Sequence, residues 1–169
     1  MQARIDIDHD DEAWKQLLPD HKNFISQTIA LCIKKFAKHP LFNNKKIVEV
    51  SVLLSHDEYM AQINEQYREQ DKPTNVLSFA TAHDYKSPLL DAHQTDPELM
   101  LGDLVFAHET IQREAAEQSK SFADHMRHLI IHGTLHLLGF DHMEDDEAER
   151  MEAFEIELLK IFNVANPYQ

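Results

Sequence analysis

Three histidines in the run HGTLHLLGFDH have the residue type and the spacing of a metal site: His132, His136 and His142. Two histidines four residues apart on a helix project from one face, so both can reach one ion. Gly139 follows them, and a glycine there can adopt the left-handed conformation that ends a helix and turns the chain back. We therefore expect His142 to meet the same ion. Three imidazoles and an open position are typical of a catalytic zinc site.

Gly133 distinguishes this run from a metalloprotease motif. The same histidine spacing occurs in metzincin proteases, H-E-x-x-H-x-x-G-x-x-H, where a glutamate follows the first histidine. Here Gly133 takes that place, so the general base of a peptidase is missing unless another part of the chain supplies it. His128 also lies four residues before His132, but chance pairs at this spacing are expected among 12 histidines. We expect His128 near the site and not among the ligands.

The expected cofactor is one divalent metal ion held by the three histidines of the run. Imidazole ligands suit zinc, nickel, copper and iron. Zn²⁺ is the first expectation from ligand type and availability, and Ni²⁺ is the alternative. From these residues alone, the chain is predicted to be a metal-activated hydrolase of unspecified substrate.

Length and composition favour one domain over residues 1–169 with a core of its own. No stretch has the length of a membrane span, and the N-terminal MQARIDIDHDDEAW lacks the basic and apolar regions of a signal peptide. The single cysteine, Cys32, excludes an internal disulfide and a cysteine metal cluster. These features favour a cytoplasmic protein without a membrane partner. The net charge of −14 points away from generic nucleic-acid binding, although lysines in the first third permit phosphate contacts.

Hydrophobic periodicity predicts the elements that position the histidines. Apolar residues recur at helical spacing over 21–38 and over 121–138. Ser55, with Glu58 at the capping-box position, is predicted to begin a helix that runs to about Arg68. The other predicted elements are strands at 3–8, 47–54, from about 76, and 101–107, a loop at 83–98, and helices at 108–118 and 144–162.

This order of elements predicts an α+β fold: a small mixed β-sheet packed with about five helices. The strand at 101–107 is expected to pair antiparallel with the strand before it. The helix at 121–138 is apolar on most sides, so it is expected to lie at the centre of the domain. A buried helix that carries metal ligands has the rigidity that a catalytic geometry needs.

Several motifs together resemble one known family. HGTLHLLGFDH, followed by MEDDEAERMEAFE, resembles the C-terminal signature of the YbeY family of bacterial metal-dependent endoribonucleases. YREQDKPTNVLSF resembles the family's second signature, LGDLVFA resembles a further family strand, and the closing NPY is also typical. The resemblance extends from about residue 47 to the end. The chain departs from the family pattern at Ala80, where many members have proline, and at Asn75, where aspartate is common.

The resemblance implies an endoribonuclease that prefers single strands and acts in small-subunit (16S) ribosomal RNA maturation and ribosome quality control. It implies RNA and ribosomal or ribosome-assembly proteins as partners, with no DNA expected. It also matches His132, His136 and His142 to the family's metal ligands, and Arg68 and His132 to its catalytic residues. The nucleophile stays open between water and the ribose 2′-hydroxyl, since both routes place extra negative charge on the phosphate.

The residues leave alternative roles and functions open. Arg68 can stabilise a charged phosphate as a planar, bidentate donor, or it is an ordinary helix-end arginine. Asp141 either orients a ligand imidazole or lies in a plain turn. Asn75 donates to substrate or satisfies backbone groups. The alternative functions are another metal-dependent hydrolase, such as a peptidase or deacylase, and a non-catalytic ribosome-assembly factor with a structural metal.

Overall fold

The computed structural model describes residues 1–81, 96–141 and 145–169, and these form a four-stranded sheet covered by helices. The strand order is β1-β2-β4-β3; β1, β2 and β4 run parallel, and β3 pairs antiparallel with β4. The predicted mixed sheet and its antiparallel pair are therefore confirmed. The strands are β1 (Gln2–His9), β2 (Ile47–Ser55), β3 (Val76–Ala80) and β4 (Glu98–Ala107).

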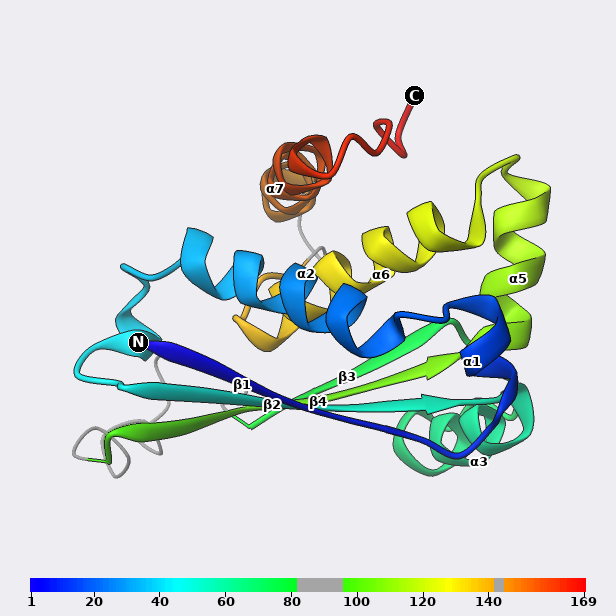
Figure 1. Ribbon diagram of the computed structural model, residues 1–169, viewed down its shortest axis with the longest axis horizontal. Helices are drawn as coiled ribbons and strands as arrows, with labels where there is room; N and C mark the ends of the chain where they lie inside the picture. Colours follow the sequence, from blue (N-terminus) through cyan, green and yellow to red (C-terminus); the bar gives the residue numbers. More distant parts are fainter. Residues whose placement is uncertain (82–95, 142–144) are drawn as a thin grey trace.

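The helices lie on both faces of this sheet (Figure 1). Helices α2 and α6 lie along one face, α3 lies against the other, and α7 lies beyond α6 on the side away from the sheet (Figure 1). The described helices are α1 (Ala13–Leu17), α2 (His21–Lys35), α3 (Asp57–Arg68), α5 (His108–Glu117), α6 (Phe122–Leu137) and α7 (Asp145–Ile161), with a short 3-10 turn at Pro40–Phe42.

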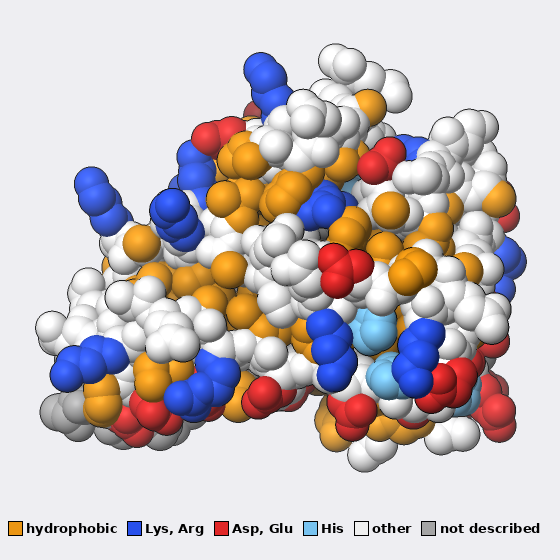
Figure 2. All heavy atoms as spheres, viewed as in Figure 1, with side chains coloured by type: hydrophobic (Ala, Val, Ile, Leu, Met, Phe, Trp, Pro, Cys, Tyr) orange, Lys and Arg blue, Asp and Glu red, His pale blue; other side chains and the backbone are white. Residues whose placement is uncertain are grey.

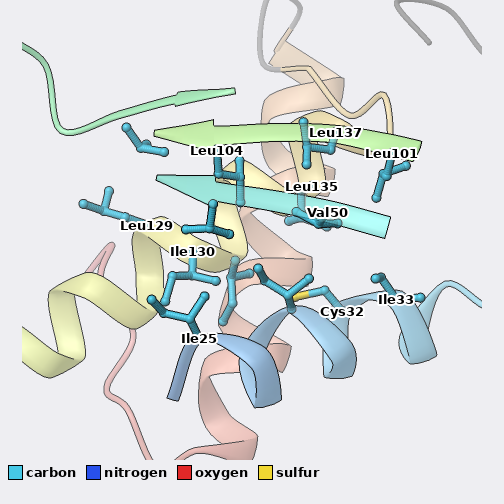
Figure 3. Packing of buried hydrophobic residues seen from close by; sticks show 14 of the residues in the cluster. Ile25, Cys32, Ile33, Val50, Leu101, Leu104, Leu129, Ile130, Leu135 and Leu137 are labelled. Atoms are coloured by element: carbon cyan, nitrogen blue, oxygen red, sulfur yellow. The ribbon is translucent and has the colours of Figure 1, made fainter. Parts of the chain in front are cut away.

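Helix α6 is buried between the sheet, α2 and α7, as its apolar sequence predicts. Its side chains meet those of the strands on one side and those of α2 on the other (Figure 3). Ile130, Ile131, Leu135 and Leu137 are all 0% exposed. Burial of such a side chain contributes about 1.5–3 kcal/mol, so α6 is held in place by the core itself.

Some predicted boundaries differ from the structure. Ser55 does not cap α3; it is the last residue of β2, and its hydroxyl donates to Asp10 Oδ2 at 2.8 Å. The cap is His56, whose ring accepts from the Tyr59 amide. Helix α1 was not predicted because one turn and a half is too short for periodicity to reveal. Strand β4 begins at Glu98, and the predicted loop at 83–98 falls largely outside the described residues.

Cys32 lies in the core and packs as a small apolar residue. It is 0% exposed, and burial raises the pKa of its thiol to about 12, so the neutral thiol is the stable form. Across the described residues, no helix combines the length and the apolarity that crossing a bilayer requires.

Candidate metal centre

Helix α6 places two of the predicted ligands side by side. The Nε2 atoms of His132 and His136 are 3.1 Å apart, and both residues are half-buried. Two nitrogen ligands at the usual zinc distance of about 2.05 Å, arranged tetrahedrally, lie about 3.3 Å apart. The two imidazoles are therefore spaced to bind one ion.

The partners of the other ring nitrogens define the tautomer of each histidine. His132 Nδ1 lies 2.6 Å from Glu155 Oε1, and His136 Nδ1 lies 2.9 Å from the carbonyl oxygen of Phe140. A carboxylate and a carbonyl can only accept, so both Nδ1 atoms carry the hydrogen. Both Nε2 atoms then direct a lone pair towards the same point. A divalent cation satisfies both lone pairs, which would otherwise repel each other.

The turn after α6 supplies one of these partners. Gly139 has a positive φ of 88°, as the sequence predicts. The amide of Gly139 donates to the carbonyl of His136, and that of Phe140 donates to the carbonyl of Leu135, each at 3.0 Å. This hydrogen-bond pair is the Schellman motif, which reverses the chain at a helix end. It brings the Phe140 carbonyl back over the ring of His136.

The third predicted ligand, His142, lies outside the described residues. Asp141, the residue before it, is exposed and lines a cavity of about 190 Å³ together with Gly139 and Phe140. Whether Asp141 orients a ligand therefore stays a prediction.

Glu155 is a buried residue next to the histidine pair that the sequence did not lead us to expect there. It comes from α7 and is 0% exposed, yet it holds a charge. Burial alone would raise its pKa, but hydrogen bonds from His128, His132 and Tyr168 outweigh burial and lower it to about 2. The phenol of Tyr168, placed beside this carboxylate and partly buried, has a raised pKa. The signal in the sequence was a glutamate in the apolar stripe of Met151 and Leu158.

His128, His132 and Glu155 form a second group that could hold a metal, since one donor atom from each lies within 4.8 Å of the others. The distances favour hydrogen bonds instead. His132 Nδ1 and Glu155 Oε1 are 2.6 Å apart, which is closer than two ligands of one tetrahedral ion. His128 Nε2 lies 3.2 Å from Glu155 Oε2, which also accepts from the Tyr168 hydroxyl. We therefore take Glu155 as a hydrogen-bond partner of the predicted ligand His132.

A cavity of about 440 Å³ opens beside His132 and is lined by polar side chains of α5, of α6, of the segment before β3 and of the C-terminal tail. Asn75 Nδ2 donates to both oxygens of Glu114, at 3.1 and 3.0 Å, and Glu114 Oε2 lies 2.7 Å from His125 Nε2. Burial opposes charge on Glu114, but the hydrogen bonds of His125 and Asn75 dominate and lower its pKa. Asn75 thus reaches the edge of the site, held by a carboxylate from α5.

Comparison with known proteins identifies the family of the chain. A family model described as Endoribonuclease YbeY matches residues 8–163. The chain belongs to the endoribonuclease YbeY family. The resemblance seen in the sequence motifs is therefore confirmed. The endoribonuclease YbeY of Magnetococcus marinus is 50% identical over 122 residues, covering 72% of this chain and 83% of that protein. The endoribonuclease YbeY of Sinorhizobium medicae is 39% identical over 168 residues, covering 99% of this chain and 95% of that protein.

A solved structure supports the fold. The solution structure of TM1509 from Thermotoga maritima matches with a TM-score of 0.52 and covers 98% of this chain and 96% of that chain. The two sequences are 21% identical, so this likeness bears on the α+β fold and not on the chemistry.

Arg68, which the YbeY signature marks as catalytic, is the last residue of α3 and is exposed. It lines neither of the two cavities next to the histidines, and within the described part of the chain it forms no ion pair. Residues 69–75 lead from it round the β3 edge of the sheet to Asn75 at the larger cavity. Its catalytic role stays a prediction from the family motif.

Gly133 has a packing role that explains the absent glutamate. A Cβ atom at this position would lie 2.9 Å from Leu104 Cδ2 and 3.2 Å from Ser78 Oγ. The position therefore faces the sheet, where α6 approaches β3 and β4 closely. A glutamate here would have its Cβ pressed against β3 and β4, so the position that carries the general base in a metzincin is closely packed in this chain.

Replacing Gly133 by alanine should lower the free energy of unfolding. Alanine is better than glycine in a helix by about 1 kcal/mol, but overpacking a core costs about 1–3 kcal/mol. Urea unfolding followed by circular dichroism measures the balance. Adding Leu104→Val removes the closest clash, so the double variant should lose less stability than the sum of the single variants. A gain in stability from Gly133→Ala would contradict the close approach.

Proposed function

We propose that this chain is a metal-dependent endoribonuclease that prefers single-stranded RNA, and that it acts in small-subunit ribosomal RNA maturation and ribosome quality control. The observation that carries the proposal is the pair of imidazoles on α6. Their Nε2 atoms are 3.1 Å apart, and each ring is fixed by a hydrogen bond at Nδ1, in a chain whose relatives are named endoribonuclease YbeY.

In this proposal the residues of the chain hold the ion and the phosphate. His132, His136 and His142 bind one divalent ion, with Zn²⁺ preferred and Ni²⁺ as the alternative. When bound, the ion polarises a phosphoryl oxygen and lowers the pKa of bound water to roughly 7. Arg68 contributes a permanently charged guanidinium for the phosphate oxygens. His132 is thus both a ligand and part of the catalytic group.

Charge restricts how the RNA approaches. On the side shown in Figure 2, Lys and Arg side chains lie among apolar and acidic side chains and form no continuous basic surface. Lys45 is buried and donates to the carbonyl of Asp96, and Lys35 pairs with Glu157. These two lysines of the first third are therefore engaged within the protein, whereas Lys22, Lys34, Lys38 and Lys46 are exposed. A protein with net charge −14 would then bind a short stretch of RNA through a local field.

The alternative functions are less well supported. A peptidase or deacylase with this centre needs a base in place of the missing glutamate, and Gly133 faces the sheet. A non-catalytic assembly factor would carry a closed structural metal with four protein ligands, whereas the α6 run supplies three.

The remaining assignments are part of the same proposal. We take residues 1–169 as one endoribonuclease domain, located in the cytoplasm where ribosomes are assembled. Its partners are ribosomal RNA and ribosomal or ribosome-assembly proteins, with no membrane and no DNA.

Removal of the metal tests the function. Protein treated with a chelator and then freed of it should lose cleavage of a labelled single-stranded RNA, because the group that activates the nucleophile is gone. Adding back Zn²⁺ should restore cleavage, and a parallel titration with Ni²⁺ would rank the metals. The RNA duplex and the DNA strand of the same sequence serve as substrate controls, and both should be cleaved more slowly.

Two results would contradict the proposal. Metal-free protein that cleaves as fast as the reconstituted protein would exclude a metal-dependent reaction. Cleavage restored equally in His136→Ala would trace the activity to a contaminating nuclease.

A further inference from the structure

Glu155, which is buried, is the centre of a hydrogen-bond network that joins α6, α7 and the C-terminal tail. Its Oε1 accepts from His132 Nδ1 at 2.6 Å. Its Oε2 accepts from the hydroxyl of Tyr168 and lies 3.2 Å from His128 Nε2. We call these four residues, His128, His132, Glu155 and Tyr168, the Glu155 network.

We infer that Glu155 and Tyr168 are positioning residues of the metal centre: Glu155 holds His132 with its Nε2 facing His136, and Tyr168 holds the Glu155 carboxylate. The inference rests on the metal site proposed above and extends it to the last residues of the chain. Neither residue contacts the ion or the RNA in this scheme; each acts through His132.

The chemistry of the His132–Glu155 pair supports this role. A ligand histidine that donates its second N–H to a carboxylate has a fixed ring orientation and a more basic metal-binding nitrogen. Burying a carboxylate is costly unless its oxygens are paired. Glu155 is 0% exposed, and both of its oxygens have partners. Its Oε1 is directed at His132, a predicted ligand.

The tail is folded so that Tyr168 reaches this carboxylate. After α7, Asn163 has a positive φ of 57°, and the Val164 amide donates to the carbonyl of Leu159 at 3.1 Å. The same type of turn ends α6 at Gly139. It directs residues 164–169 back towards α6. The amide of Tyr168 then donates to Asn166 Oδ1 at 2.9 Å, which fixes the last turn of the chain.

The test measures metal affinity in two variants that alter the network and keep its shape. Glu155→Gln removes the charge and should weaken Zn²⁺ binding, measured by competition with a chelator, on the order of 10–100-fold. Tyr168→Phe removes one hydroxyl and should have a smaller effect in the same direction. Glu149→Gln, an exposed position on α7, and Tyr67→Phe, an exposed position on α3, are the matched controls and should bind as wild type.

The double variant Glu155→Gln with Tyr168→Phe distinguishes a role of Tyr168 in positioning Glu155 from general packing of the tail. If Tyr168 acts through Glu155, Tyr168→Phe should add little once Glu155→Gln is present. Independent packing of the tail would give additive losses. A second readout needs no metal: ¹⁵N NMR of the metal-free protein should show His132 with hydrogen on Nδ1, and Glu155→Gln should shift hydrogen towards Nε2.

The outcomes decide between this inference and the site on which it rests. Wild-type metal affinity and an unchanged His132 tautomer in Glu155→Gln would overturn the inference. Complete metal loss in Glu155→Gln, equal to that in His132→Ala, would make Glu155 a ligand and overturn it as well. If Glu155→Gln does not fold, Tyr168→Phe decides, because it keeps the carboxylate. Metal retained by His132→Ala would refute the proposed site itself.

Discussion

Replacing His132, His136 or His142 by alanine should remove the bound metal and, with it, RNA cleavage. Each variant deletes one of three imidazole ligands. The loss of affinity should exceed the roughly 10–100-fold that follows from removing a residue behind a ligand. The bound metal is measured by elemental analysis after gel filtration, and cleavage by the decay of a labelled single-stranded RNA.

His128→Ala is the matched control, because His128 lies one turn before His132 on the same helix. Its Nε2 is 3.2 Å from Glu155 Oε2, so its loss should disturb the Glu155 network slightly and leave the metal in place. Full metal retention in any two of the three ligand variants would contradict the assignment. Metal loss in His128→Ala together with retention in His136→Ala would point to the group of His128, His132 and Glu155 instead.

The pairing of two imidazoles on α6 and the turn that follows could be predicted because they are encoded within a few residues. The four-residue spacing of His132 and His136 requires only a helix, and the turn at Gly139 requires only its positive φ of 88°. The buried position of α6 follows from its apolar composition. Local spacing and conformation therefore account for the pair of imidazoles that face each other at 3.1 Å.

The partners of the site could not be predicted, because they come from distant parts of the chain. Glu155 lies 23 residues after His132, and Glu114 lies 39 residues after Asn75. The acidic run after the histidine motif is typical of a solvated helix face. Glu155 departs from that pattern because it falls in the buried stripe of α7. The stripe of Met151 and Leu158 marks Glu155 as the glutamate that turns inward, but only the packing of α7 on α6 shows that it meets His132.

The fold shows the same division between local and distant signals. The run IVEVSVLL predicts that β2 is a buried strand. Its position between β1 and β4 could not be predicted, because it depends on contacts between segments far apart in the sequence. The end of β2 was misjudged for a physical reason. Ser55 has the residue type of a helix cap, but its hydroxyl donates to Asp10. Strand β2 therefore includes Ser55 as its last residue.

Arg68→Ala should keep the fold and the metal and lose RNA cleavage. The transition state of phosphodiester cleavage carries extra negative charge on the phosphate, and a guanidinium can donate two parallel hydrogen bonds to it. Removing one such electrostatic donor typically costs on the order of 10²–10³ in rate. Single-turnover cleavage measures the rate, and elemental analysis measures the metal. Arg68→Lys keeps the charge without the planar fork, so it should recover only part of the activity.

Because Arg68 is exposed at the end of α3, a loss of activity in Arg68→Ala can be distinguished from a loss of stability. An exposed arginine without an ion pair among the described residues contributes little to stability, so a large loss of rate in a stable variant must come from the reaction. Arg113→Ala is the matched control. Arg113 is also exposed on a helix, and its guanidinium pairs with the carboxylate of Asp57 at the start of α3. Cleavage by Arg68→Ala within a few-fold of wild type would show that Arg68 is an ordinary helix-end residue. RNA would then be positioned by other groups, of which Asn75 at the edge of the cavity beside His132 is the first to replace.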